Sequence, residues 1–473
     1  MSARRAGLSA LALVVLLAQT ASAQRPLGWR TDGTGNYPQA HPPVEWSLTH
    51  NVLWSTPMPS WSNSSPVLVG DRILMSSEPD TVVCLRAGDG KILWQRPNPV
   101  EDAVAKLSHP PPFLQAGAQT RQLETSLQQQ EYDLTGLRRL LGKSANDATL
   151  SGRAHALEER SADLRQRLGS LAPLMRPDVN TENGFSSPTP ASDGDSVYVL
   201  YATGVAASYD LDGKRRWIQF VDQPLARDGV SASPVLAGDK LLVLVNDLFA
   251  LDTATGEIRW RTSVALRQGT PIVFQIEDQD FALLPSGDCV RVADGAVVAS
   301  GIGDLEYASP VIRDHRLYMV QQKAQAFRVP EKLDALDFKE LWATHMKGAR
   351  YYSSPLILDG LIYAVSRNDI LSVLDAETGD PVYVQRLDLG SMGGVNSVYA
   401  SPTEGGPYVF VSGVGGTTVV LKPGRQFEQV ASNELEKVRA TPVFDGDRIY
   451  IRGHKNFYCI SSEAGGATSP TAR

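Results

Sequence analysis

The sequence predicts an all-β protein, an eight-bladed β-propeller of four-stranded antiparallel blades with an inserted α-helical hairpin. Three observations predict this fold. A pair of small or hydroxyl residues followed by proline recurs eight times, short apolar strands follow most copies, and one long segment with a helical pattern interrupts the repeat. Four short strands every ~40–45 residues are typical of propeller blades.

The first 23 residues have the pattern of a secretory signal peptide. Arg4 and Arg5 precede an apolar run, and Ala21-Ser22-Ala23 is a small-residue cleavage pattern. The run is too short for a transmembrane helix, and no cysteine lies near the cleavage site. We therefore expect cleavage after Ala23 and a periplasmic or secreted protein with no transmembrane segment and no lipid anchor. Residues 24–50, rich in Pro, Gly and Trp, are expected to form an arm on the folded body.

The spacing of the repeat marker defines the blades. The first interval between marker prolines is 122 residues, and the next six are 46, 37, 39, 45, 47 and 40. The first interval therefore contains an insertion. We assign residues 51–100 to blade 1 and a closing strand of blade 8, 101–177 to the insertion, 178–463 to blades 2–8, and 464–473 to a disordered tail. The eight markers end at Pro66, Pro188, Pro234, Pro271, Pro310, Pro355, Pro402 and Pro442.

The two ends of the repeat predict a closed ring. Only three strands follow the eighth marker, and they end near Cys459-Ile460. The missing fourth strand matches Asn51-Val52-Leu53-Trp54, which no blade precedes. Closure by strands from both ends removes the exposed sheet edge of an open array.

The insertion changes from a β-strand pattern to a helical one. Residues 120–172 are rich in Leu, Gln, Arg and Glu, and their leucines fall on two helical faces separated by Gly142 to Thr149. In the second face, Ala154 and Ser161 occupy the heptad positions that lack leucine. This pattern predicts an antiparallel hairpin with a coiled-coil seam between blades 1 and 2.

The composition limits the function classes. The net charge is −7, and no concentrated basic region favours nucleic acid. Three cysteines are too few for a disulfide framework. Cys84, Cys289 and Cys459 fall at one repeat position, so we expect them to fill packing sites, and a Cys84–Cys459 bridge stays an open alternative. Four tryptophans that share one repeat position are expected to pack between blades: Trp94, Trp217, Trp260 and Trp342.

Residues 250–260 read Ala-Leu-Asp-Thr-Ala-Thr-Gly-Glu-Ile-Arg-Trp, and residues 373–379 repeat part of this turn. The chain thereby resembles the PQQ-like β-propeller repeat family. The resemblance implies one of two functions: a quinoprotein dehydrogenase that binds PQQ and Ca²⁺, or a non-enzymatic scaffold of the BamB type. Compact blades, the absence of a Cys-Cys pair and the absence of His-x-His or His-Glu-x-x-His spacings make the scaffolds the closer match in character.

The innermost strands carry the candidate site, because they line the channel and its mouth. The position three residues before the marker proline varies between blades, and it is Ser231 in blade 3. At the other seven markers it predicts a binding ring at the channel mouth, formed by Asn63, Phe185, Gln268, Tyr307, Tyr352, Tyr399 and Arg439. If the chain were a dehydrogenase, Asp304, Glu306 and Asn396 would be the candidates for Ca²⁺. Arg350 would then lie near the quinone.

These observations favour a non-catalytic exported scaffold that binds a protein or another macromolecule through the propeller rim or the hairpin. Under this interpretation there is no cofactor, no metal and no catalytic residue, although enzyme activity is left open. One alternative is a PQQ- and Ca²⁺-dependent dehydrogenase of alcohols or sugars. A second alternative is a carbohydrate-binding propeller that uses Tyr307, Tyr352 and Tyr399 as stacking platforms.

Overall fold

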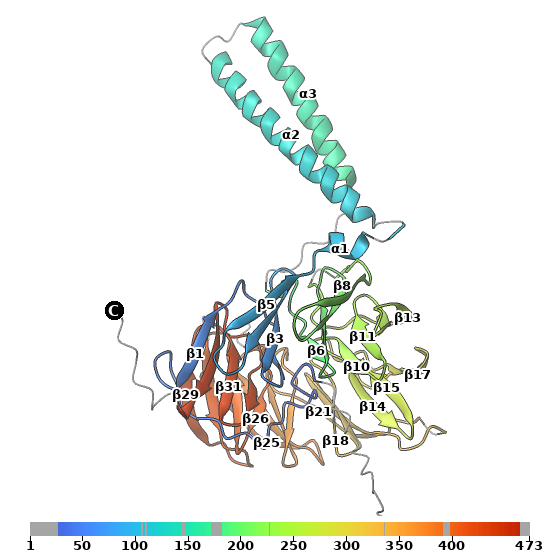
Figure 1. Ribbon diagram of the computed structural model, residues 1–473, viewed down its shortest axis with the longest axis vertical. Helices are drawn as coiled ribbons and strands as arrows, with labels where there is room; N and C mark the ends of the chain where they lie inside the picture. The colour runs from blue at the N-terminus through green and yellow to red at the C-terminus, as the bar shows by residue number, and fades with distance from the viewer. Residues whose placement is uncertain are drawn as a thin grey trace, which may run out of the picture.

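The computed structural model describes residues 27–463, except 106, 109–110, 143–146, 172–181, 227, 335 and 391–397. The predicted signal peptide and C-terminal tail therefore lie outside the described residues. Eight four-stranded antiparallel sheets surround a central channel, and a helical hairpin extends from one side of this ring (Figure 1). The eight-bladed propeller with an inserted hairpin is thus confirmed.

Each blade is a meander whose first strand lies innermost. Within a blade the strands alternate with tight turns, and buried apolar residues dominate the second and third strands. Blades 1–4 contain β2 (Val67–Val69), β3 (Arg72–Ser77), β4 (Thr81–Arg86), β5 (Ile92–Pro97); β6 (Ala191–Ser192), β7 (Ser196–Leu200), β8 (Val205–Asp210), β9 (Arg215–Phe220); β10 (Val235–Ala237), β11 (Lys240–Leu244), β12 (Leu248–Asp252), β13 (Ile258–Thr262); and β14 (Ile272–Ile276), β15 (Gln279–Leu283), β16 (Cys289–Arg291), β17 (Val297–Ala299). Blades 5–8 contain β18 (Val311–Arg313), β19 (Arg316–Val320), β20 (Lys323–Arg328), β21 (Glu340–His345); β22 (Leu356–Leu358), β23 (Leu361–Val365), β24 (Ile370–Asp375), β25 (Pro381–Arg386); β26 (Thr403–Gly405), β27 (Tyr408–Ser412), β28 (Thr417–Leu421), β29 (Gln429–Glu434); and β30 (Val443–Asp445), β31 (Arg448–Arg452), β32 (Asn456–Ser461), β1 (Val52–Pro57).

The ring closes as the sequence predicts. Strand β1 pairs antiparallel with β32, with Val52 opposite Ile460 and Trp54 opposite Cys459. The N-terminal strand therefore completes the blade formed by the C-terminal end of the chain, and blade 8 has four strands like the others.

The recurring tryptophans join each blade to the next one. Trp94 of blade 1 donates its indole N–H to the carbonyl of Leu211 in blade 2, at 2.9 Å. Its ring also covers Gly213, which has a φ of +82°, and a Cβ built there would lie 2.6 Å from Trp94 Cδ2. Glycine thus serves two purposes in this turn: it adopts the left-handed backbone and leaves room for the indole. Trp217, Trp260 and Trp342 donate to the next blade in the same way.

The three cysteines fill equivalent buried positions. Cys84 and Cys459 lie opposite Trp94 and Trp54 on the neighbouring strand, and Cys289 lies opposite Ala299. All three are buried and free, so the alternative of a Cys84–Cys459 bridge is wrong.

The insertion forms a short helix and a long hairpin. Helix α1 (Val100–Val104) is followed by α2 (Pro112–Leu141) and α3 (Ala148–Leu171), whose facing side includes buried Leu134, Leu137 and Ala154. The two long helices project away from the propeller (Figure 1). No helix in the described part of the chain is long and apolar enough to cross a membrane.

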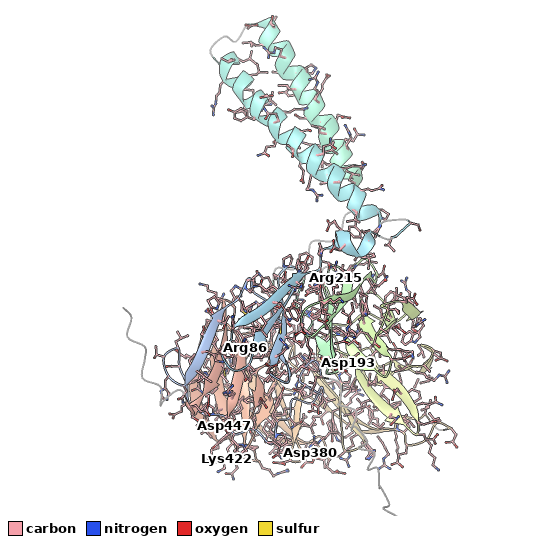
Figure 2. The ribbon with its side chains drawn as sticks, viewed as in Figure 1. Arg86, Asp193, Arg215, Asp380, Lys422 and Asp447 are labelled. Carbon is pink, nitrogen blue, oxygen red and sulfur yellow. The ribbon has the colours of Figure 1, made fainter. Side chains whose placement is uncertain are left out.

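The base of the insertion is fixed to blade 2. Phe113 packs against Phe220 with ring centroids 5.9 Å apart. Asp102 of α1 accepts a hydrogen bond from Arg215 of β9 at 2.9 Å, and Arg215 lies just below α1 in Figure 2. Blade 2 therefore anchors the hairpin, while the rest of the hairpin extends beyond the ring.

The arm before β1 lies against the propeller. Leu27 pairs with Ser192 next to the channel, and Trp46 is buried against blade 7, where its backbone N–H donates to Asn433. The Arg30 side chain is almost fully buried and donates to the carbonyls of Pro355 and Pro402, both at 2.9 Å. Arg30 thereby connects the arm to the marker prolines of blades 6 and 7.

Candidate functional site

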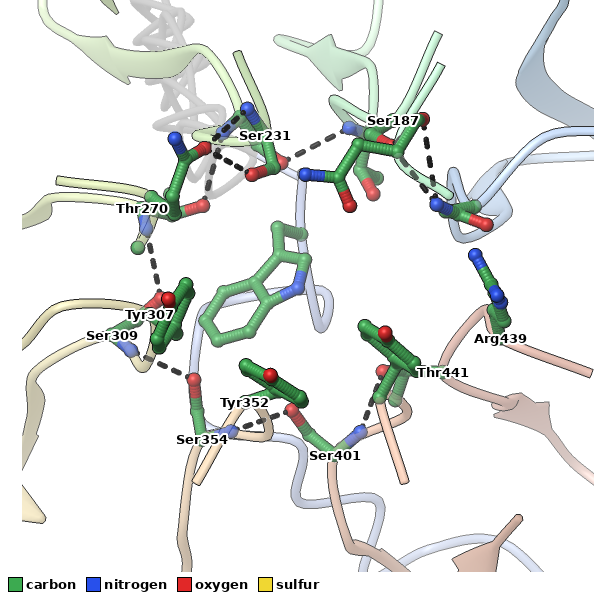
Figure 3. A pocket seen from close by; sticks show the side chains of 18 of the residues that line it. Ser187, Ser231, Thr270, Tyr307, Ser309, Tyr352, Ser354, Ser401, Arg439 and Thr441 are labelled. Carbon is green, nitrogen blue, oxygen red and sulfur yellow. Dashed lines mark hydrogen bonds between the residues drawn. The ribbon is translucent and has the colours of Figure 1, made fainter. Parts of the chain in front are cut away.

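A ring of eight hydroxyl side chains encircles the channel. In each blade the backbone N–H of the residue before the marker proline donates to the hydroxyl of the equivalent residue in the next blade, at 2.8–3.1 Å. Thr441 of blade 8 donates to Ser65 of blade 1, so the ring closes on itself. The recurrent Ser or Thr of the marker is therefore structural. The ring consists of Ser65, Thr189, Ser233, Thr270, Ser309, Ser354, Ser401 and Thr441 (Figure 3).

Blade 2 corrects the predicted register of this repeat. Its ring member is Thr189, before Pro190, rather than Ser187 before Pro188. Pro188 and Pro190 each follow a hydroxyl residue, so the sequence alone did not decide which of them is the marker proline. The residue three positions before the true marker proline is Ser187, so the prediction that Phe185 belongs to the mouth ring is wrong. Phe185 packs against the core of blades 2 and 3.

A cavity of about 290 Å³ opens at the channel mouth above the hydroxyl ring. Figure 3 shows Tyr307 and Arg439 on opposite sides of this opening, with Tyr352 between them along one wall. The structure therefore brings together residues from all eight blades. Six of the seven residues predicted for the ring line the cavity: Asn63, Gln268, Tyr307, Tyr352, Tyr399 and Arg439.

The arm contributes a residue that the sequence interpretation missed. Trp29 lines the mouth cavity and also a second, more apolar cavity of about 380 Å³ beside the innermost strands of blades 3–5. Its indole therefore lies between the two spaces. The adjacent Arg30 fixes this position through its two buried hydrogen bonds, and its guanidinium lies 5.3 Å from the Trp29 ring centroid. The Gly28-Trp29-Arg30 sequence was the only signal, and it did not indicate the channel.

Glu182, in the described residues just before blade 2, also lies at the mouth. Glu182 accepts a hydrogen bond from the Tyr399 hydroxyl at 2.7 Å, and its backbone carbonyl accepts from Asn63 and Arg439. The backbone N–H groups of Phe185 and Ser186, a few residues after Glu182, donate to the Glu78 carboxylate of blade 1, at 2.9 and 2.7 Å. Residues 182–186, which precede blade 2, are thus held by hydrogen bonds at one rim of the cavity.

Three tyrosines form a continuous aromatic wall. Tyr352 and Tyr399 stack with centroids 5.0 Å apart and an interplanar angle of 8°, and Tyr307 meets Tyr352 edge-on at 4.7 Å. Burial and a hydrogen bond with Glu306 raise the pKa of Tyr307 to about 12. Burial, followed by the contact with Glu182, raises the pKa of Tyr399. Both hydroxyls are therefore neutral donors at physiological pH.

Of the residues expected under the dehydrogenase alternative, the described acidic ones lie outside the mouth cavity. Asp304 is bound to Arg267 at 2.8 Å, and neither Asp304 nor Glu306 lines the cavity. Asn396 lies outside the described residues. Arg350 does line the cavity, with its guanidinium 6.0 Å from the Tyr307 ring centroid. Among the residues that the structure describes, no three or more His, Cys, Asp or Glu side chains are arranged to hold a metal ion.

Two solved structures share this architecture. BamB from Moraxella catarrhalis is 12% identical with a TM-score of 0.54, and the match covers 87% of this chain and 97% of that one. The computationally designed Ika8 protein is 9% identical with a TM-score of 0.52, and the match covers 87% and 99% of the two chains. At these identities the likeness shows the fold alone. No curated protein matches the chain.

The sequence family described as "Outer membrane protein assembly factor BamB" matches residues 45–176, 172–302 and 304–472. These ranges include every strand of the propeller and both long helices of the hairpin. The chain therefore belongs to the BamB family of PQQ-like β-propeller proteins.

Proposed function

We propose that this protein is an exported, non-catalytic scaffold that binds another protein through its helical hairpin and the adjacent propeller rim. The observation that carries this proposal is the geometry of the hairpin. Helix α2 contains 30 residues, which corresponds to about 45 Å at ~1.5 Å per residue, and only its base packs against the propeller. A rigid arm of this length offers a large surface to a partner.

The hairpin surface has features of a contact site. Tyr132 is 77% exposed and Leu140 is 50% exposed, and both lie on α2 away from the propeller. Aromatic side chains are enriched at protein interfaces because they bury much area at low entropic cost. The exposed ion pairs Arg138–Glu158 and Arg165–Glu131, at 2.8 and 2.6 Å, connect the two helices beside them.

Site-specific crosslinking in the producing cells tests the hairpin. A photo-crosslinker at Tyr132 should give a discrete adduct with an exported or outer-membrane protein, identified by mass spectrometry. A crosslinker at Val384, which is 38% exposed on β25 of blade 6, across the ring from blade 2, is the matched control. Equal adduct patterns at the two positions would contradict a role for the hairpin.

A shortened hairpin provides the complementary variant. Glu131 lies beside Arg165, and Arg138 beside Glu158, across the two helices. Removing residues 130–166 and joining the ends with a short glycine linker therefore shortens both helices to the same distance from the propeller. Phe113 and its contact with Phe220 stay in place. We expect a folded propeller with loss of the adduct partner from affinity purification.

The absence of cofactor chemistry is part of the proposal and needs its own test. The purified protein is titrated with PQQ and Ca²⁺ while quinone absorbance and dye reduction with alcohols or sugars are measured. We expect neither stoichiometric binding nor turnover. Binding with turnover would replace the scaffold proposal by a dehydrogenase.

A further inference from the structure

The mouth cavity has two chemically different walls. On the side of blades 5–8 lie the three tyrosines and two arginines described above. On the side of blades 1–4 lie amide and carboxylate groups, among them Asn63, Asn183, Asp228 and Gln268. Trp29 of the arm adds an indole between them. The combination of aromatic surface and many polar side chains suits a ligand that is ring-shaped and rich in hydroxyl groups.

The tyrosines do not act as three separate platforms. Tyr352 and Tyr399 stack on each other, and Tyr307 packs edge-on against Tyr352. These contacts occupy part of each ring face, so the tyrosines provide a rigid wall with hydroxyl donors. Among the described ring contacts Trp29 has no aromatic partner; the Arg30 guanidinium lies over one face of its ring, 5.3 Å from the centroid. The opposite face of the indole is the better stacking surface for a sugar ring.

The two arginines provide the positive charge of the site, and Glu182 and Asp228 are its two carboxylates. The Glu182 carboxylate accepts the hydrogen bond of the Tyr399 hydroxyl. The Arg439 guanidinium lies 4.8 Å from the Tyr399 ring centroid and donates to the backbone carbonyl of Glu182. Arg350 donates to the Tyr307 hydroxyl at 3.4 Å. In the described part of the chain neither guanidinium has a carboxylate within 4 Å, whereas Arg267 and Arg215 on the same propeller are paired. Both arginines can therefore receive a carboxylate, for which the guanidinium fork is well suited.

We propose that the channel mouth binds an acidic saccharide, with one hexuronate unit seated on Trp29 and its carboxylate at Arg439. Hydroxyl groups of the sugar bind the amide and carboxylate side chains of blades 1–4. Arg350, at the other end of the tyrosine wall, meets the carboxylate of a neighbouring unit. The cavity of about 290 Å³ is at the small end of the range for ligand pockets, ~300–1,000 Å³, which fits one sugar unit inside and the rest of the chain outside. This site is independent of the proposed scaffold function.

Calorimetric titration of the full chain with trigalacturonate tests this proposal, with the neutral sugar maltotriose and a short aspartate-rich peptide as comparison ligands. We expect binding of the acidic sugar alone, weakened by added salt. Arg439→Gln should reduce the affinity by about 10- to 100-fold, the loss expected for a charged hydrogen bond. Arg386→Gln, an exposed arginine on the outermost strand of blade 6, is the matched control and should leave the affinity unchanged.

The midpoint of thermal unfolding, measured for each variant, shows whether a loss of affinity comes from the site or from unfolding of the protein. If Arg439→Gln unfolds, Arg350→Gln provides a second substitution, at an exposed residue. Trp29→Phe should weaken binding less than Trp29→Leu, because phenylalanine keeps an aromatic face. Equal binding of maltotriose, binding of the peptide in place of the sugar, or unchanged affinity in both arginine variants would overturn the proposal.

Discussion

The contact between Trp94 and Gly213 allows a quantitative test of how neighbouring blades are held together. Trp94 is 7% exposed and donates to Leu211 across the blade boundary. Replacing a buried tryptophan by alanine costs about 3–5 kcal/mol. Gly213→Ala has two costs. A non-glycine residue at φ +82° costs about 1–2 kcal/mol, and a Cβ 2.6 Å from the indole adds about 1–3 kcal/mol of overpacking.

The two costs of Gly213→Ala separate in a double-mutant cycle. In the Trp94→Ala background the overpacking disappears, and only the backbone cost of about 1–2 kcal/mol remains. The coupling energy should therefore be about 1–3 kcal/mol. Gly238→Ala is the matched control, because Gly238 also has a positive φ of +59° but no heavy atom within 4 Å of its built Cβ.

Denaturant unfolding followed by circular dichroism measures these differences as shifts of the midpoint at constant slope. We expect Gly213→Ala to destabilise the wild type more than Gly238→Ala does, and the two to have similar effects in the Trp94→Ala background. Additive effects of Trp94→Ala and Gly213→Ala, within about 0.5 kcal/mol, would refute the reasoning. The tryptophan would then not be the reason for glycine at this position.

Three further predictions concern the hydroxyl ring, the cysteines and residues 185–186. Thr270→Val leaves the buried backbone N–H of Ser233 without its acceptor and should lower the free energy of unfolding by about 1–3 kcal/mol in denaturant titrations. Thr270→Ser keeps the hydroxyl and should be nearly neutral. Equal losses of stability in the two variants would contradict a role for the hydroxyl. Burial raises the pKa of the Cys84 thiol from its usual value of 9.0 to about 11. Because the folded state keeps the thiol proton to a higher pH than the unfolded state does, the free energy of unfolding should fall as the pH rises from about 9 through about 11. Cys84→Ala should lessen this fall when denaturant unfolding is measured across that pH range. Glu78→Ala removes the acceptor of Phe185 and Ser186 and should speed amide hydrogen exchange at residues 185–186 while exchange in blade 5 stays unchanged; uniform acceleration in both regions would indicate general destabilisation instead.

Several structural features could be predicted from the sequence because they depend on local patterns that repeat. The proline marker, the Asp/Gly turns and the tryptophan positions recur at blade spacing, so one copy supports the interpretation of the next. The strand at Asn51–Trp54 was identifiable as the closing strand because it matched a blade position and had no blade before it. The leucine spacing of the insertion similarly predicted two helices that pack on each other.

Other features depend on contacts between segments that no local pattern links. Glu182 reaches Tyr399, 217 residues away, only because the ring places blades 2 and 7 around one channel. Trp29 lines that channel because Arg30 binds carbonyls of two blades more than 300 residues further along the chain. The register of blade 2 was likewise ambiguous between two prolines until the hydroxyl ring selected Thr189.

The sequence by itself determined the number of blades, the closure of the ring and the inserted hairpin, since each follows from a repeat or a periodicity. Only the tertiary structure decided which side chains meet at the channel mouth, that the arm supplies Trp29 there, and that the hairpin points away from the propeller. The physical reason is that a strand pattern fixes which face of a strand is buried, whereas neighbours across a channel depend on how eight separate sheets are arranged around one axis.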